Sequence, residues 1–163
     1  MVQTLNERDH PESFEGLHKL AYLLPDGRVH LILSGVALLD LRGSPAPSGQ
    51  PAPWVRETYE FTLRTDFLAG QVQLPSVPQG WRRTLHLEKW VVFAGLNSID
   101  TENLSNFAGY AVDRFRLPGA SPGFPIERDV TMAVDLAVRD EYGHIRRVGY
   151  QLDLIAFPAA VPV

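Results

Sequence analysis

The chain has 163 residues and a formal net charge of −4; 45% of its residues are hydrophobic and 21% are charged. These values are ordinary for a globular protein, and they exclude a collagen, a wholly disordered chain and a highly charged tail protein. At this length we expect one domain whose core is large enough to need no metal or disulfide. The mild acidic balance argues against nucleic acid as the main partner.

Cysteine is absent from the sequence. Its absence excludes thiol nucleophiles, disulfides, cysteine zinc sites and iron–sulfur clusters. No segment has the pattern of a signal peptide or approaches 18 consecutive apolar residues, so we expect a cytoplasmic protein that does not bind a membrane. Pro11 breaks the polar N-terminal segment. We therefore expect residues 1–16 to form a flexible leader, 17–158 a single β domain and 159–163 a C-terminal tail.

The predicted elements are strands separated by loops that are rich in glycine and proline. Pro25-Asp26-Gly27 is a turn signal between two apolar segments, and it predicts an N-terminal hairpin. Ser34-Gly35 in the second arm of this hairpin indicates a bulge or bend. The predicted strands in chain order are 17–24, 28–41, 57–67, 71–74, 84–94, 110–117, 129–140 and 144–157.

Alternation of apolar and polar residues predicts which side chains of these strands face the core. The predicted inward residues are Tyr59, Phe61 and Leu63 in the third strand, Val130, Met132, Val134, Leu136 and Val138 in the seventh, and Val148, Tyr150, Leu152, Leu154 and Ala156 in the last. We expect the last two strands to form a hairpin about Gly143. In that register Val138 lies opposite Val148, and Asp140 lies opposite Arg146.

No segment has a convincing helical period, and the nearest candidate is 99–108, where Ser98 or Asp100 would cap one or two turns. Seven or eight strands at this spacing predict an all-β fold with little helix. Two architectures fit: an antiparallel, jelly-roll-like β-sandwich or a closed β-barrel.

Catalytic motifs are missing: the sequence has no phosphate-binding glycine loop, no nucleophile elbow and no zinc-protease motif. His86 and Glu88 would share one face of a strand, about 6.5–7 Å apart. In a barrel interior they would suit a base and its partner, and Asp135 would suit a buried general base. These three are the catalytic candidates if the protein is an enzyme. Otherwise they are solvated, and we expect no metal or cofactor.

Two groups of residues are candidates for binding. Trp54, Trp81, Arg82 and Arg83 stand at junctions of loops and strands, where exposed tryptophan and arginine favour stacking on a partner. The segment 95–108 is rich in side-chain oxygen, which suits Ca²⁺ or sugar hydroxyls. Its candidate ligands are Asn97, Asp100 and Glu102. In both groups the same residues also suit a purely structural role.

Three functions follow from these observations. The first is a non-catalytic β module that binds itself or another protein through loops or a strand edge. The second is a small barrel enzyme, of cyclase or isomerase type, for an apolar small molecule. The third is a lectin-like or Ca²⁺-dependent carbohydrate-binding module. The missing motifs favour the first, with no nucleic acid and no membrane among its partners.

Overall fold

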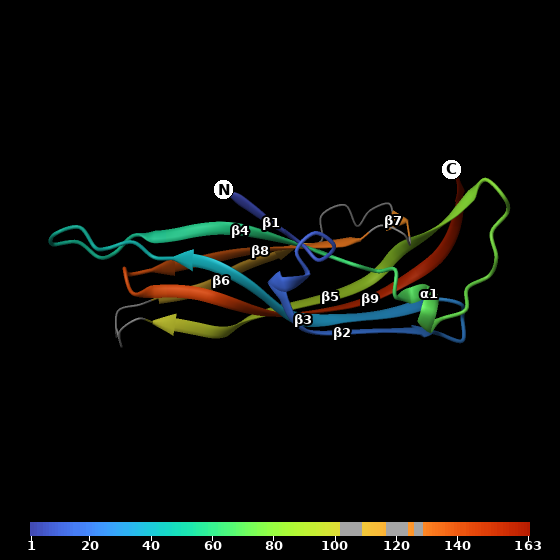
Figure 1. Ribbon diagram of the computed structural model, residues 1–163, viewed down its shortest axis with the longest axis horizontal. Coiled ribbons are helices and arrows are strands. Elements are labelled where there is room, and N and C mark those ends of the chain that lie inside the picture. The colour runs from blue at the N-terminus through green and yellow to red at the C-terminus, as the bar shows by residue number, and fades with distance from the viewer. Residues whose placement is uncertain (102–108, 117–123, 126–128) are drawn as a thin grey trace.

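The computed structural model describes residues 1–101, 109–116, 124–125 and 129–163. The described chain is almost entirely β-strand, with one turn of 3₁₀-helix and one turn of α-helix (Figure 1). In chain order the elements are β1 (Val2–Asn6), η1 (Pro11–Ser13), β2 (Phe14–Leu23), β3 (Val29–Arg42), β4 (Trp54–Leu63), α1 (Leu68–Gln71), β5 (Trp81–Thr101), β6 (Gly109–Arg116), β7 (Phe124–Pro125), β8 (Val130–Arg139) and β9 (Gly143–Pro162). The prediction of an all-β fold with little helix is confirmed.

The strands form two sheets that pack on each other. The four-stranded sheet has the order β1-β4-β8-β6, and the five-stranded sheet has the order β2-β3-β9-β5-β7. Neighbouring strands are antiparallel except β1 and β4, which are parallel. The described strands therefore belong to two separate sheets, and the closed barrel that the sequence allowed is not what they form.

The core lies between the sheets. Phe14 of β2 and Tyr150 of β9 meet Phe61 of β4, with ring centroids 5.9–6.4 Å apart, so three aromatic rings join the two sheets. The long strands β3, β5 and β9 extend beyond the four-stranded sheet, and α1 lies over the part that this sheet leaves uncovered (Figure 1). Burial raises the pKa of the Tyr150 hydroxyl well above its ordinary value.

The predicted N-terminal hairpin is confirmed. Strands β2 and β3 are antiparallel, and Gly27 has the positive φ of +86° that the turn requires. The irregularity expected at Ser34-Gly35 is present on one side: the β2–β3 register shifts here, with Gly16 and Leu17 of β2 opposite the single residue Gly35, whereas Ser34 and Gly35 stay in register with β9. Gly35 is also needed for packing: a Cβ at this position would lie 2.8 Å from the Tyr150 hydroxyl oxygen.

The predicted C-terminal hairpin is also wrong. Strand β8 pairs with β4 and β6, whereas β9 pairs with β3 and β5 in the other sheet. The turn between them is a crossing from one sheet to the other, and Asp140 adopts a φ of +80° there. The crossing passes very close to the end of β3, since a Cβ on Gly43 would lie 2.0 Å from the Asp140 carbonyl oxygen. The residues that were predicted to face inward in both strands are nevertheless buried.

The two ends of the chain contain more strand than their composition indicates. Residues 2–6 pair with β4 as β1, and β9 continues to Pro162, opposite Trp81. Glu7 follows β1 and is buried, where Lys19 Nζ donates to both of its carboxylate oxygens at 2.5–2.6 Å. The backbone N–H of Arg64 donates to the same carboxylate at 2.7 Å. This ion pair attaches the N-terminal segment to both sheets.

Candidate functional site

The three catalytic candidates do not meet. A register shift between Leu87 and Lys89 makes Glu88 an extra residue in β5, so His86 and Glu88 do not follow the simple alternation that would pair them. His86 Nε2 lies 3.3 Å from the Thr84 hydroxyl, and Glu88 accepts from Arg28 at 3.1 Å. Asp135 lies in the other sheet and accepts from the Thr58 hydroxyl at 2.7 Å.

The two candidate tryptophans are also separate. Trp54 begins β4 and Trp81 begins β5, and these strand starts lie at opposite ends of the molecule (Figure 1). Both side chains are exposed. The guanidinium groups of Arg56 and Arg139 lie 5.7 Å and 5.2 Å from the Trp54 ring, at cation–π distance. Trp54 therefore belongs to a stacked group within the four-stranded sheet.

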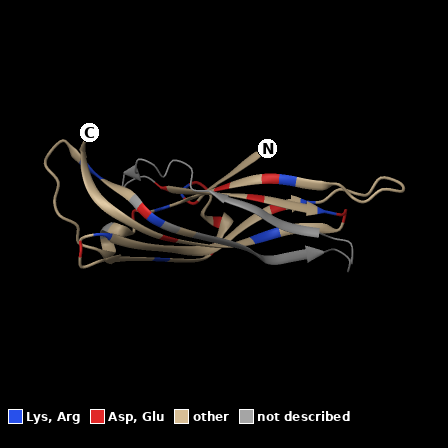
Figure 2. Cartoon of the chain, turned by 180° about the vertical axis from the view of Figure 1, so that it is seen from behind, with Lys and Arg blue, Asp and Glu red and all other residues tan. Residues whose placement is uncertain are grey.

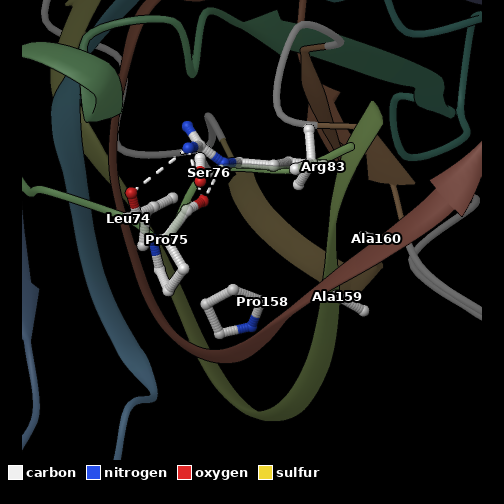
Figure 3. A pocket seen from close by; sticks show the side chains of 8 residues that line it. Leu74, Pro75, Ser76, Arg83, Pro158, Ala159 and Ala160 are labelled. Carbon is white, nitrogen blue, oxygen red and sulfur yellow. Dashed lines mark hydrogen bonds between the residues drawn. The ribbon is translucent and has the colours of Figure 1, made fainter. Parts of the chain in front are cut away.

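Arg83 is occupied by the chain itself. Its guanidinium donates to the carbonyl oxygens of Leu74 and Pro75 at 2.5–3.2 Å and so fixes the segment before β5 (Figure 3). Beside it is a small apolar pocket of about 170 Å³, lined mainly by Pro75, Val77 and Pro158–Ala160. Arg82 is exposed, opposite Val161.

The oxygen-rich segment is partly strand. The backbones of Asn97 and Asp100 lie within β5, so residues 95–101 are not the loop that their composition predicted, and the helical turns considered at 99–108 do not begin in them. Glu102 lies outside the described residues.

The outer face of the five-stranded sheet is a further candidate site, which the sequence did not single out. It brings together exposed apolar, aromatic and charged side chains from several strands. Its described members include Leu20 and Tyr22 from β2, Arg28, His30 and Ile32 from β3 and the turn before it, Asp153, Ile155 and Phe157 from β9, and His86, Glu88, Lys89 and Val91 from β5. The strand register sets them in rows. Leu20, Ile32, Asp153 and Val91 form one row, and Tyr22, His30, Ile155 and Lys89 form the next.

Apolar side chains on this face are open to solvent. Tyr22 is 49% exposed, Val91 50% and Phe157 47%, whereas Leu31 and Leu154 on the inner face of the same strands are fully buried. A single exposed apolar residue is normal on a protein surface. Three such residues on three strands of one sheet, with half-buried Ile32 and Ile155 between them, form a contiguous patch.

Four of the titratable groups on this face are paired with one another. His30 Nε2 contacts Asp153 Oδ1 across two adjacent strands, and the His30 ring lies beside the Tyr22 ring at 6.3 Å. Arg28 reaches across β9 to Glu88, and its hydrogen bonds to Glu88 and Asp26 raise the pKa of its guanidinium. Figure 2 shows how sparse charged residues are along the described long strands.

Comparisons of the chain with protein-family models, with curated proteins and with solved structures found no match. Within the described residues, no three histidine, aspartate or glutamate side chains are grouped so that they would hold a metal ion. In that same part of the chain, no helix has the length and apolar character needed to cross a membrane.

Proposed function

We propose that the chain is a non-catalytic β-sandwich module that binds a protein partner through the outer face of its five-stranded sheet. The observation that carries this proposal is the half-exposure of Tyr22, Val91 and Phe157 on one face of the sheet. Contiguous apolar patches on soluble proteins mark sites of interaction. Aromatic residues are also the side chains that most often anchor a protein interface.

The paired charges suit such a surface. Covering an unpaired charge is costly because the charge loses its water. Here His30 already contacts the Asp153 carboxylate and Arg28 pairs with Glu88, so each of these groups has a partner. A protein that covers the face therefore leaves none of these four groups without a partner. Apart from the exposed Lys89, the face therefore suits an apolar, nearly uncharged surface opposite it.

The face is a better candidate than the edge strand β2. The edge of β2 is partly blocked, because the Gln71 side chain accepts from the Ala21 N–H at 2.7 Å and donates to the Lys19 carbonyl at 3.1 Å. These two bonds take the backbone groups that an added strand would use. Trp54 and Trp81, at opposite ends of the molecule, would not act together as one anchor.

The enzyme hypothesis gains no support from the described pocket. None of His86, Glu88 and Asp135 lines it, and its volume of about 170 Å³ is below the roughly 300 Å³ at which small-molecule sites begin. A pocket of this size would accept one apolar side chain. The carbohydrate hypothesis depends on Asn97, Asp100 and Glu102, and it stays a prediction.

A photo-reactive amino acid at position 157 tests the proposed function. The matched control carries the same group at Tyr142, which is exposed at the turn between β8 and β9. In the cells that make the protein, light is expected to give protein adducts from position 157 at several times the yield from position 142. Equal yields, or no protein adduct from position 157, would contradict the proposal.

A further inference from the structure

We propose that the partner is a second copy of this chain, with the outer faces of two five-stranded sheets packed on each other about a two-fold axis. This inference rests on the proposed function, because it names the occupant of the same face. It is argued from charge, from shape and from area.

The low net charge of this face is compatible with packing against a second copy of the same face. Arg28 and Lys89 are cationic, Glu88 and Asp153 are anionic, and Asp26 at the turn, which bonds Arg28, adds one negative charge. With histidine neutral these residues sum to −1, although the chain as a whole carries −4. Most of the acidic excess therefore lies elsewhere on the molecule. Two copies that approach through this face bring together two nearly neutral surfaces, so the repulsion between their net charges is smallest there.

The shape of the face also suits a second sheet. Two sheets pack face to face about 10 Å apart when side chains from alternate positions fit between one another. Large apolar and polar side chains alternate on β3, as Ile32 and His30 do, and Asp153 stands beside Ile155 and Phe157 on β9. About a two-fold axis, each copy contributes the same set of side chains to the interface, which is the arrangement of an isologous dimer.

The area of this face is of the order that a dimer interface needs. The apolar patch covers four strands about 4.8 Å apart over about six residues of about 3.3 Å each, which is roughly 400 Å² of sheet plane. Strands β3, β9 and β5 continue well beyond the patch, with 14, 20 and 21 residues. The outer-facing residues of β3 and β9 extend the contact toward the roughly 800 Å² per partner of a standard interface.

Sedimentation equilibrium of the purified full chain tests the inference. We expect a dimer that persists in about 1 M salt, where charges more than about 3 Å apart are screened. Phe157→Glu and, separately, Val91→Glu place an unpaired acid in the face and are expected to weaken association at least about 30-fold. The control Tyr142→Glu adds the same charge at the β8–β9 turn and is expected to leave association unchanged. Far-UV circular dichroism and melting show whether each variant folds.

Several outcomes overturn the inference. A wild-type chain that stays monomeric at high micromolar concentration does so, as does a dimer that survives both folded variants. If the monomer still gives adducts to a different protein from position 157, the proposed function stands and only the identity of the occupant is wrong. If position 157 gives no adduct at all, both proposals fail.

Discussion

The outer faces of the two sheets differ in chemistry although their strands follow the same alternation. On the four-stranded sheet the outward residues of β4 and β8 bond to one another, as in Thr58 to Asp135 at 2.7 Å and Thr62 to Thr131 at 3.2 Å. On the five-stranded sheet the outward positions include Tyr22, Val91 and Phe157. Contiguous exposed apolar residues are typical of interaction surfaces, so this difference supports our proposal that the second face binds a partner.

The largest expected effect separates an inner phenylalanine from an outer one. Phe61→Ala removes a fully buried ring that contacts Phe14 and Tyr150, and it should lower the free energy of unfolding by about 3–5 kcal/mol. Phe157→Ala should cost the monomer less than about 1 kcal/mol, because about half of this ring is already in water. Urea denaturation of both variants at a dilution that would dissociate the proposed dimer measures the difference. Equal losses would mean that Phe157 is a core residue.

A smaller effect is expected at the ion pair that joins the N-terminal segment to the two sheets. Glu7→Gln leaves Lys19 without its buried carboxylate partner, so we expect a loss of about 2 kcal/mol in the free energy of unfolding. Glu12→Gln is the control, because this glutamate is exposed in η1 and should change stability by less than about 0.5 kcal/mol. Chemical denaturation checks both, and a loss at Glu7 no larger than at Glu12 would show that the pair does not stabilise the fold.

On the outer face of the four-stranded sheet, Thr58→Val removes the hydrogen bond to Asp135 and should cost about 1 kcal/mol of stability. It should leave association unchanged, because this face is not part of the proposed interface. Thermal melting and sedimentation of the same sample report the two quantities. A weakened dimer with unchanged stability would move the interface to the four-stranded sheet.

The smallest expected effect concerns Trp54, which the sequence singled out as an anchor. Trp54→Ala should shift the association constant by less than about twofold, since the ring stacks on Arg56 and Arg139 of its own chain. The loss of that stacking should lower stability by about 1 kcal/mol. An association constant lowered 30-fold would restore Trp54 as the interface anchor in place of the five-stranded face.

Burial on the inner faces could be predicted from sequence, because a strand with one face in the core must alternate. Tyr59, Phe61 and Leu63 illustrate this, and all three are buried. Pairing could not be predicted in the same way. Alternation shows which face of a strand is apolar but not which strand lies beside it, so β8 and β9 were joined as a hairpin when their turn in fact crosses between sheets.

Simple alternation of apolar and polar residues did not predict two features of the candidate site, the bulge in β5 and the apolar outer face. The extra residue at Glu88 shifts the register of β5, and nothing in its immediate sequence marks that shift. The outer face did leave a signal, however, in the unbroken apolar runs Leu31-Ile32-Leu33 and Leu154-Ile155-Ala156-Phe157. Such runs are typical of strands that are covered on both faces, and one of these two faces is open in the single chain.

The most direct measurement uses the absence of cysteine, because a single introduced cysteine then reacts alone with a thiol reagent. Val91→Cys places it on the outer face of the five-stranded sheet, and Arg56→Cys places it on that of the four-stranded sheet. As protein concentration rises through the association range, the rate of maleimide modification should fall at position 91 and stay constant at position 56. Rates that stay equal and independent of concentration at both positions would contradict the claim that the five-stranded face is covered by a second copy of the chain.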